Sequence, residues 1–186
     1  MVPLNVPNLL TVVRILLVPV LVVALLDQTS GGDLLAAIVF AVASLTDAID
    51  GYLARSRNSV TNFGKLMDPI ADKLLIIAAL VVLVSLGRLE AWVAMVIIAR
   101  EFAVTVLRVA VGAQQHVVIP ASAWGKAKTA TQVAMVICLI AVPGHPLWLQ
   151  LLIYVTVAIT LVSGADYFFG LRRRLAQQPP GRPQST

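Results

Sequence analysis

Six long apolar stretches, separated by short polar breaks, dominate the hydrophobic pattern of this chain. They lie at about residues 9–26, 34–56, 69–87, 91–113, 122–142 and 147–170. A helix needs roughly 20 mostly apolar residues to cross the hydrocarbon core of a bilayer. Three of the breaks carry turn residues, at Asp27 to Asp33, at Gly87 and Arg88, and at Pro143 to Pro146. The pattern predicts an all-α polytopic membrane protein with six transmembrane helices.

The composition supports this class. The 186 residues are 59% hydrophobic and 12% charged, with a mean hydropathy of +0.92, whereas soluble domains are about 45–50% apolar and about 25% charged. We expect one membrane domain over residues 1–171 and a basic, disordered cytoplasmic tail over residues 172–186. The single cysteine, Cys138, excludes a disulfide framework. Nucleic acid is not expected as a partner, because no soluble basic domain is present to bind it.

Lysine and arginine are distributed unevenly between the two sides that the six stretches define. The side with the three turn-rich breaks holds only Arg88, and the side with both termini holds the other 13 of the 14 Lys and Arg residues. Because cytoplasmic loops carry the excess of Lys and Arg, we expect both termini to be cytoplasmic. Most stretches are also polar at this inner end, which predicts a polar cavity open to the cytoplasm. The alternative is that each side chain reaches the interface independently.

Four aspartates stand where the second and third stretches meet. A charge in hydrocarbon costs several kcal/mol, roughly 2.5–3.5 even on a lenient scale. Asp47 and Asp50 share one helical face with Gly51 and Ala54, and Asp68 and Asp72 share a face of the third stretch. We expect this third helix to begin with Asp68 as its N-cap and Pro69 in its first turn.

If the second and third helices are antiparallel neighbours, the four carboxylates converge. Hard oxygen ligands select Mg²⁺, Mn²⁺ or Ca²⁺ rather than zinc, and two such ions about 3.5–4 Å apart suit displacement at phosphorus. Taken singly, Asp68 could be a helix cap and Asp50 could pair with Arg55 or Arg57. Acids in a membrane cavity also suit a cation transporter. A transporter would need polar residues along a pathway across the whole membrane, whereas the outer halves of these stretches consist mainly of Val, Leu and Ile.

The pattern Asp47-x2-Asp50-Gly51-x2-Ala54-Arg55-x8-Gly64-x3-Asp68-x3-Asp72 resembles the signature of the CDP-alcohol phosphotransferase family at every fixed position. The resemblance implies a homodimer of six-helix subunits with two divalent cations, Mg²⁺ or Mn²⁺, between the second and third helices. It implies that the four aspartates bind metal and that Asp72 is the catalytic base. The CDP group is then expected to contact Asn8, Asp47, Gly51, Ala54, Arg55, Gly64 and Asp68.

Other segments narrow the resemblance to part of the family. Residues 7–14, and Ile98 to Glu101 with Arg108, look like the branch that makes phosphatidylglycerophosphate or cardiolipin. Residues 124–132 look most like the members that make phosphatidylglycerophosphate, since cardiolipin-forming members tend to have Asn where Lys128 stands. Glycerol 3-phosphate is a dianion and needs cations. The expected acceptor phosphate site comprises Arg100, Arg108, Lys126, Lys128, Thr129 and Gln132.

Two of these residues have simpler interpretations. Arg100 could form an internal ion pair with Glu101, and Lys126 could reach the interface alone, because it points about 200° away from Lys128. The resemblance implies phosphatidyl transfer from CDP-diacylglycerol to glycerol 3-phosphate, among membrane lipids at the cytoplasmic face of a bacterial inner membrane. Cardiolipin synthesis and transfer to another alcohol are the alternatives within the family.

Overall fold

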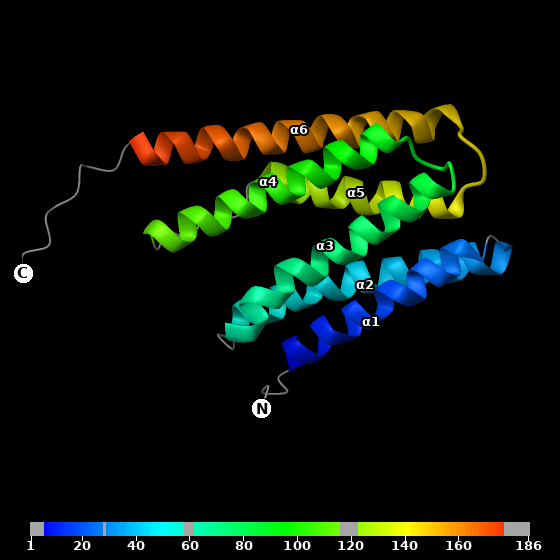
Figure 1. The fold of residues 1–186 in the computed structure, drawn as a ribbon, viewed down its shortest axis with the longest axis horizontal. Coiled ribbons are helices and arrows are strands. Elements are labelled where there is room, and N and C mark those ends of the chain that lie inside the picture. Colours follow the sequence, from blue (N-terminus) through cyan, green and yellow to red (C-terminus); the bar gives the residue numbers. More distant parts are fainter. Residues whose placement is uncertain (1–5, 28, 58–61, 116–122, 177–186) are drawn as a thin grey trace, which may run out of the picture.

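All regular elements in the described part of the chain are helices. The computed structural model describes residues 6–27, 29–57, 62–115 and 123–176. Side chains are described for residues 12–27, 29, 31–46, 73–108 and 123–172. The helices are α1 (Val6–Leu26), α2 (Ser30–Arg57), α3 (Asn62–Ser85), α4 (Ala91–Gln115), α5 (Ala123–Ala141) and α6 (Leu147–Ala176). The six apolar stretches of the sequence therefore correspond to six helices (Figure 1).

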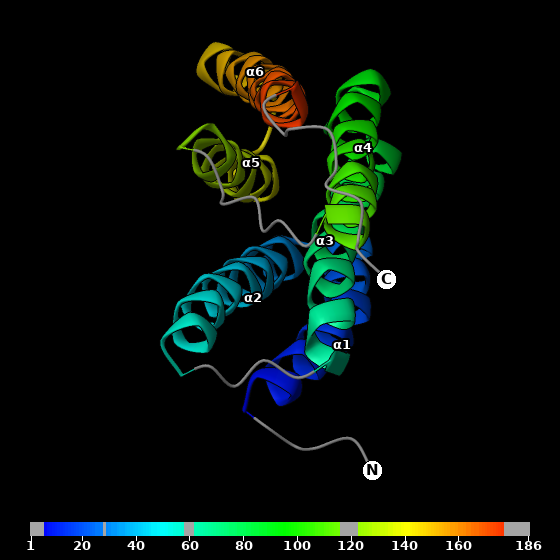
Figure 2. The same ribbon diagram turned by 90° about the vertical axis from the view of Figure 1, so that its left-hand side faces the viewer.

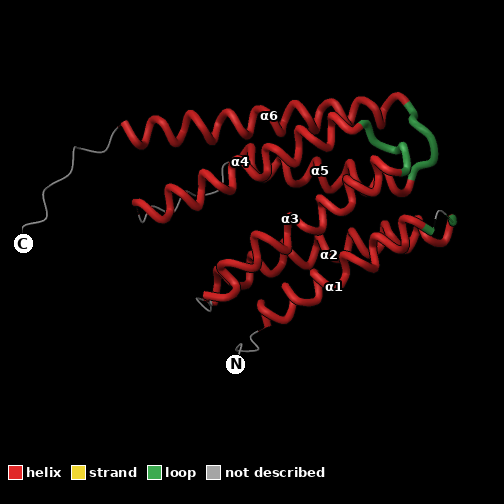
Figure 3. The backbone as a smooth tube through the Cα atoms, in the orientation of Figure 1, coloured by secondary structure: helices red, strands yellow, loops and turns green. Residues whose placement is uncertain are grey.

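The helices run back and forth between two ends of an elongated bundle (Figures 1 and 3). The connections α1–α2, α3–α4 and α5–α6 lie at one end, here called the loop end. The start of α1 and the end of α6 lie toward the opposite end, here called the termini end, where α2 and α4 finish and α3 begins. This alternation is the one that the hydrophobic pattern predicts.

Seen from the termini end, the bundle consists of two rows of helices (Figure 2). One row contains α1, α3 and α4, and the other contains α2, α5 and α6. Within the rows α1 packs on α3, α3 on α4, α2 on α5 and α5 on α6, and across the rows α1 packs on α2, α3 on α5 and α4 on α6. Because of this arrangement, α2 and α3 stand diagonally to each other, and each packs on both α1 and α5.

The buried residues divide the bundle into an apolar half and a polar half. The main apolar cluster, which includes Leu25, Phe40, Leu83 and Ile97, lies in the loop-end half of the helices. The buried polar side chains lie beyond this cluster, at mid-helix or closer to the termini end, except Thr156, which lies next to Val157 of the cluster. They are Arg14, Glu101, Lys128, Gln132, Thr156, Thr160 and Ser163. Polar residues are therefore buried inside the bundle toward the end where the sequence predicts a polar cavity.

The outside of the bundle is rich in large apolar side chains. Leu16 is 62% exposed, and Leu34, Met95 and Leu161 are also exposed. Large contiguous apolar surface on a monomer marks contact with lipid or with other proteins. By length and composition, Leu147–Arg172 is long and apolar enough to cross a membrane, and shorter apolar helical segments cover Val12–Leu26, Gly31–Thr46 and Lys73–Ser85.

Two boundaries differ from the predictions. Helix α3 begins at Asn62 rather than at Asp68, so the prediction that Asp68 is an N-cap was wrong. Residues 62–67, which include Gly64 and Lys65, continue the helix toward the termini end, because a helix pairs most of its own backbone groups in any solvent. Helix α6 continues to Ala176, into the segment that the sequence predicts as a disordered tail.

Arg88 is neutralised at the loop end. Its Nη1 and Nη2 atoms donate to the two carboxylate oxygens of Asp33 at 2.8 and 2.9 Å, and Nη1 also contacts the carbonyl oxygen of Ile140 at 3.3 Å. Such two-pronged pairs are the stronger type of Arg–carboxylate contact. The contact ties the α3–α4 connection to α2 and α5. Gly87 precedes it with a φ of 69°, which favours glycine.

Candidate active site

The backbone places the four signature aspartates at matching depths in α2 and α3. Asp47 lies ten residues before Arg57, the last residue of α2, and Asp72 lies ten residues after Asn62, the first residue of α3. At 1.5 Å per residue, each is about 15 Å from the termini end of its helix, whereas Asp50 and Asp68 are both about 10 Å from it. Their side chains lie outside the part that the structure describes, as do those of Asn8, Gly51, Ala54, Arg55 and Gly64.

Lys73 lies between the sequence position of Asp72 and the rest of α3, and it is close to a second group of charged residues on α4 and α5. It follows Asp72 in α3 and lies near enough to Lys128 in α5 to act on it electrostatically. Helices α3 and α5 also pack directly on each other. The acidic segment of α3 is therefore adjacent to the positively charged part of α5.

Glu101 is the centre of this second group. Its Oε1 atom accepts a hydrogen bond from Nη1 of Arg100 at 3.0 Å and another from Nζ of Lys128. Glu101 is 8% exposed and Lys128 is 6% exposed. A buried charge needs a partner to offset its lost hydration, and here one carboxylate serves two cations. The internal Arg100–Glu101 pair that the sequence suggested is thus present.

Three polar links join α4, α5 and α6 at this level. Glu101 joins α4 to α5 through Lys128. Arg100 joins α4 to α6, because its Nη2 donates to Oγ of Ser163 at 2.7 Å. Gln132 joins α5 to α6, since its Nε2 donates to Oγ1 of Thr160 at 3.2 Å. We call these residues the polar cluster: Arg100, Glu101, Lys128, Gln132, Thr160 and Ser163.

The six residues that were predicted to bind the acceptor phosphate fall into a group inside the bundle and a group on its surface. Arg100, Lys128 and Gln132 belong to the polar cluster, whereas Arg108, Lys126 and Thr129 are exposed. The guanidinium carbon of Arg108 lies 5.8 Å from the ring centroid of Tyr167. Thr129 donates to the carbonyl oxygen of Gly125 at 3.2 Å. The predicted common face of Lys128, Thr129 and Gln132 is therefore only partly buried.

Sequence reasoning missed the contribution of α6. Thr156, Thr160 and Ser163 follow one another at helical spacing and are almost completely buried. The same spacing continues to Tyr167, whose hydroxyl is buried and has no hydrogen-bond partner within the described part of the chain. The signal was present in the sequence as hydroxyl residues every third or fourth position in an otherwise apolar helix. Glu101 was considered as the partner of Arg100 and as part of the segment that resembles the family, and its contact with Lys128 was not predicted.

The sequence argument for convergence assumed that the second and third helices are direct neighbours, whereas α2 and α3 stand diagonally to each other. The chemistry of the four carboxylates, at two matched depths, still fits hard divalent cations, because Mg²⁺ and Mn²⁺ prefer oxygen ligands. Within the side chains that the structure describes, no group of three or more His, Cys, Asp or Glu residues offers another such site. Asp47, Asp50, Asp68 and Asp72 therefore remain the candidate ligands, on the chemistry of the donor set and the backbone depths.

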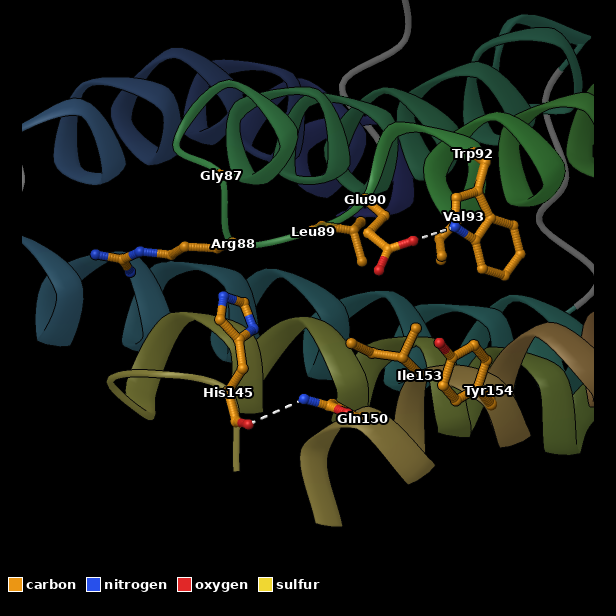
Figure 4. Close-up of a pocket in the computed structure, with 10 residues that line it drawn as sticks. All are labelled: Gly87, Arg88, Leu89, Glu90, Trp92, Val93, His145, Gln150, Ile153 and Tyr154. Carbon is orange, nitrogen blue, oxygen red and sulfur yellow. Dashed lines mark hydrogen bonds between the residues drawn. The ribbon is translucent and has the colours of Figure 1, made fainter. Parts of the chain in front are cut away.

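A hollow of about 340 Å³ lies at the opposite end of the bundle (Figure 4). It is lined by the α3–α4 connection, the start of α4, the α5–α6 connection and the start of α6. Its charged groups are already engaged, since Arg88 pairs with Asp33 and Glu90 accepts a hydrogen bond from Nε1 of Trp92. The rings of Trp92 and Tyr154 stack with centroids 6.3 Å apart. None of the predicted site residues lines this hollow.

Comparison with known proteins identifies the class of protein that this fold and signature define. The model of the CDP-alcohol phosphatidyltransferase family matches residues 4–162. The chain belongs to this family and is a membrane-associated transferase, which confirms the resemblance found in the signature.

Relatives in three bacteria are similar over most of the chain. The CDP-diacylglycerol–glycerol-3-phosphate 3-phosphatidyltransferase of Bacillus subtilis (strain 168) is 41% identical over 184 residues, covering 88% of this chain and 93% of the relative. A probable phosphatidylglycerophosphate synthase of Mycobacterium tuberculosis (strain ATCC 25618 / H37Rv) is 43% identical over 169 residues, covering 88% of this chain and 79% of the relative. A protein of Salmonella choleraesuis (strain SC-B67) has the same name as the Bacillus relative. It is 35% identical over 185 residues, covering 94% of this chain and 98% of the relative.

Proposed function

We propose that this chain transfers the phosphatidyl group of CDP-diacylglycerol to the 1-hydroxyl of glycerol 3-phosphate, forming phosphatidylglycerophosphate and CMP. The observation that carries the proposal is the 41% identity, over 88% of the chain, to a relative named for this reaction. The complete signature from Asp47 to Asp72 supports the same chemistry.

The polar cluster supports a phosphorylated acceptor. Arg100 and Lys128 place two positive charges inside the bundle, against one negative charge on Glu101. Lys73 adds a further positive charge nearby. Phosphate groups bind best where cations and N–H donors are already in place. An uncharged acceptor such as inositol would need fewer of these cations.

The signature residues would bind the other substrate. Asp47, Asp50, Asp68 and Asp72 would hold Mg²⁺ or Mn²⁺, which when bound neutralises the diphosphate and stabilises charge on the leaving group. Asn8, Gly51, Ala54, Arg55 and Gly64 would contact the CDP group. Glycine and alanine on the α2 face would let the nucleotide approach the backbone closely, and Arg55 would offset phosphate charge.

Asp72 is the proposed general base. Its carboxylate would take the proton from the 1-hydroxyl of glycerol 3-phosphate. The acceptor oxygen then forms a bond to the β-phosphorus of CDP-diacylglycerol, while the bond from that phosphorus to the oxygen of CMP breaks. CMP leaves with the bonding electron pair. Lys73 follows Asp72 in the sequence and acts electrostatically on Lys128, one of the cations that would hold the acceptor phosphate.

The membrane arrangement belongs to the same proposal. All six helices would span a bacterial inner membrane, with the termini end facing the cytoplasm and the polar half of the bundle forming a cavity open to that side. The charge distribution supports this orientation, since 13 of the 14 Lys and Arg residues lie on the side of the termini. The exposed apolar surface supports contact with lipid. The active form would be a homodimer.

The test is an acceptor competition with purified protein, CDP-diacylglycerol and Mg²⁺. Glycerol 3-phosphate, phosphatidylglycerol, inositol and serine would each be supplied at equal concentration, and lipid products separated by mass. Phosphatidylglycerophosphate and stoichiometric CMP are expected with glycerol 3-phosphate alone. Cardiolipin formed from phosphatidylglycerol, or a product with another alcohol at a greater rate, would refute the acceptor assignment.

A further inference from the structure

The two buried cations proposed to bind the acceptor phosphate share one anchoring atom. Oε1 of Glu101 accepts from both Arg100 and Lys128, and Oγ of Ser163 holds the other end of the Arg100 guanidinium at 2.7 Å. We infer that Glu101 and Ser163 are positioning residues that aim Arg100 and Lys128 at the phosphate of the acceptor. This inference rests on the proposed function above and deepens it.

The charge balance of the group favours an incoming anion. A carboxylate that served only to neutralise a buried cation would need one partner, but Glu101 has two, which leaves a positive charge that it does not balance. Inside a protein such a surplus is costly until an anion offsets it. Glycerol 3-phosphate supplies that anion.

Arg100 also has donor capacity that the described residues do not use. Its Nε atom is buried and has no hydrogen-bond partner among them, although buried donors in folded proteins are almost always paired. An arginine has five N–H donors in a rigid fork. A phosphate oxygen could accept from this Nε donor, while Nη1 and Nη2 each donate one hydrogen bond, to Glu101 and Ser163.

Fixing these side chains in advance should strengthen binding of the acceptor. Lysine and arginine lose considerable rotamer freedom when they are held in one geometry. Because Glu101 and Ser163 hold them before the acceptor arrives, that loss does not weaken acceptor binding. Neither residue belongs to the proposed CDP site. Their removal should therefore weaken recognition of the acceptor more than recognition of CDP-diacylglycerol.

The experiment measures KM for both substrates in the full-length enzyme, in detergent micelles at fixed mole fractions of CDP-diacylglycerol. Glu101→Gln keeps the size and the oxygen but removes the charge. It should raise KM for glycerol 3-phosphate about tenfold, equivalent to about 1.4 kcal/mol, and change KM for CDP-diacylglycerol less than about twofold. Glu101→Asp keeps the charge and should recover part of the loss.

Ser163→Ala provides a milder variant and Thr156→Val its matched control. Ser163→Ala removes one hydrogen bond to Arg100 and should raise KM for glycerol 3-phosphate about threefold. Thr156 is equally buried on the same helix, but its hydroxyl contacts only the carbonyl oxygens of Thr131 and Leu152. Thr156→Val should leave both KM values within about twofold of the wild type.

Equal rises in the two KM values of Glu101→Gln, or no rise for glycerol 3-phosphate, would overturn the inference while the proposed function stands. If Glu101→Gln does not fold, the comparison of Ser163→Ala with Thr156→Val decides, and equal KM values in these two variants overturn the inference. A wild-type enzyme that does not use glycerol 3-phosphate would overturn the proposed function, and the inference with it.

Discussion

Gly164 lies against the side chain of Arg100. An added methyl group at this position should affect acceptor binding and helix stability in opposite directions. A Cβ atom added to Gly164 would lie 3.4 Å from Cγ of Arg100 and 3.8 Å from Nε, with no closer contact. These are ordinary van der Waals distances, so the methyl group would fit. It would nevertheless occupy space beside the unused Nε donor.

Gly164→Ala should therefore raise KM for glycerol 3-phosphate several-fold without lowering the melting temperature. Alanine within a helix is favoured over glycine by about 1 kcal/mol, and the neighbouring atoms leave room for it. The measurement pairs acceptor kinetics with thermal unfolding of the same preparation. An unchanged KM would show that Nε of Arg100 does not face the acceptor.

Asp72→Asn tests the proposed role of Asp72 as the general base. The amide cannot take a proton from the acceptor hydroxyl, so turnover should fall at least about a thousandfold, within the range that general bases contribute together with their electrostatic role. Binding of CDP-diacylglycerol should be partly retained. Asp166→Asn is the control, since Asp166 is an exposed carboxylate on α6. Near-normal turnover in Asp72→Asn would remove Asp72 from the role of base.

Among the elements, α6 holds the polar half of the bundle together through its hydroxyl groups. Thr160 accepts from Gln132 of α5, and Ser163 accepts from Arg100 of α4. Hydrogen bonds between helices in a membrane contribute about 0.6 kcal/mol on average and up to about 1.7. The position of α6 therefore depends on a few specific contacts as well as on its apolar packing.

Thr160→Val should lower the stability of the bundle by about 1–2 kcal/mol, because it leaves the buried amide of Gln132 without its partner. Thermal unfolding in detergent measures the change. Thr156→Val should have a smaller effect, since the hydroxyl of Thr156 donates mainly to the carbonyl oxygen of Leu152 in its own helix at 2.8 Å. Equal losses in the two variants would contradict a specific contribution of the hydrogen bond between Gln132 and Thr160, since Thr156 contacts α5 only through the carbonyl oxygen of Thr131 at 3.4 Å.

For the whole molecule, the separation of apolar and polar halves determines the expected orientation. The loop end holds one cation, Arg88, and Asp33 neutralises it. In the sequence, the other 13 Lys and Arg residues fall on the side of the termini. A membrane-impermeant maleimide added to intact cells should therefore label His145→Cys at the loop end and should not label Thr186→Cys. Labelling of Thr186→Cys from outside, above the wild-type background from Cys138, would reverse the orientation.

The six helices could be predicted from the sequence because hydrophobicity alone determines where long apolar helices form. The start of α3 could not, because polar residues such as Lys65 continue a helix beyond its apolar part. The acid signature was visible because its spacing is local. The roles of Glu101 and Ser163 were not visible, since they depend on which residues α4, α5 and α6 bring together across 27 or more positions of sequence.

We propose that Asp47, Asp50, Asp68 and Asp72 hold the divalent cations on which phosphatidyl transfer depends. The most direct test is electron paramagnetic resonance of Mn²⁺ bound to the purified enzyme, titrated with and without CDP-diacylglycerol. The wild type should bind roughly two Mn²⁺ per chain, and Asp68→Asn should lose Mn²⁺ binding and turnover together. Turnover that persists in EDTA, or equal Mn²⁺ binding by the wild type and Asp68→Asn, would contradict this proposal.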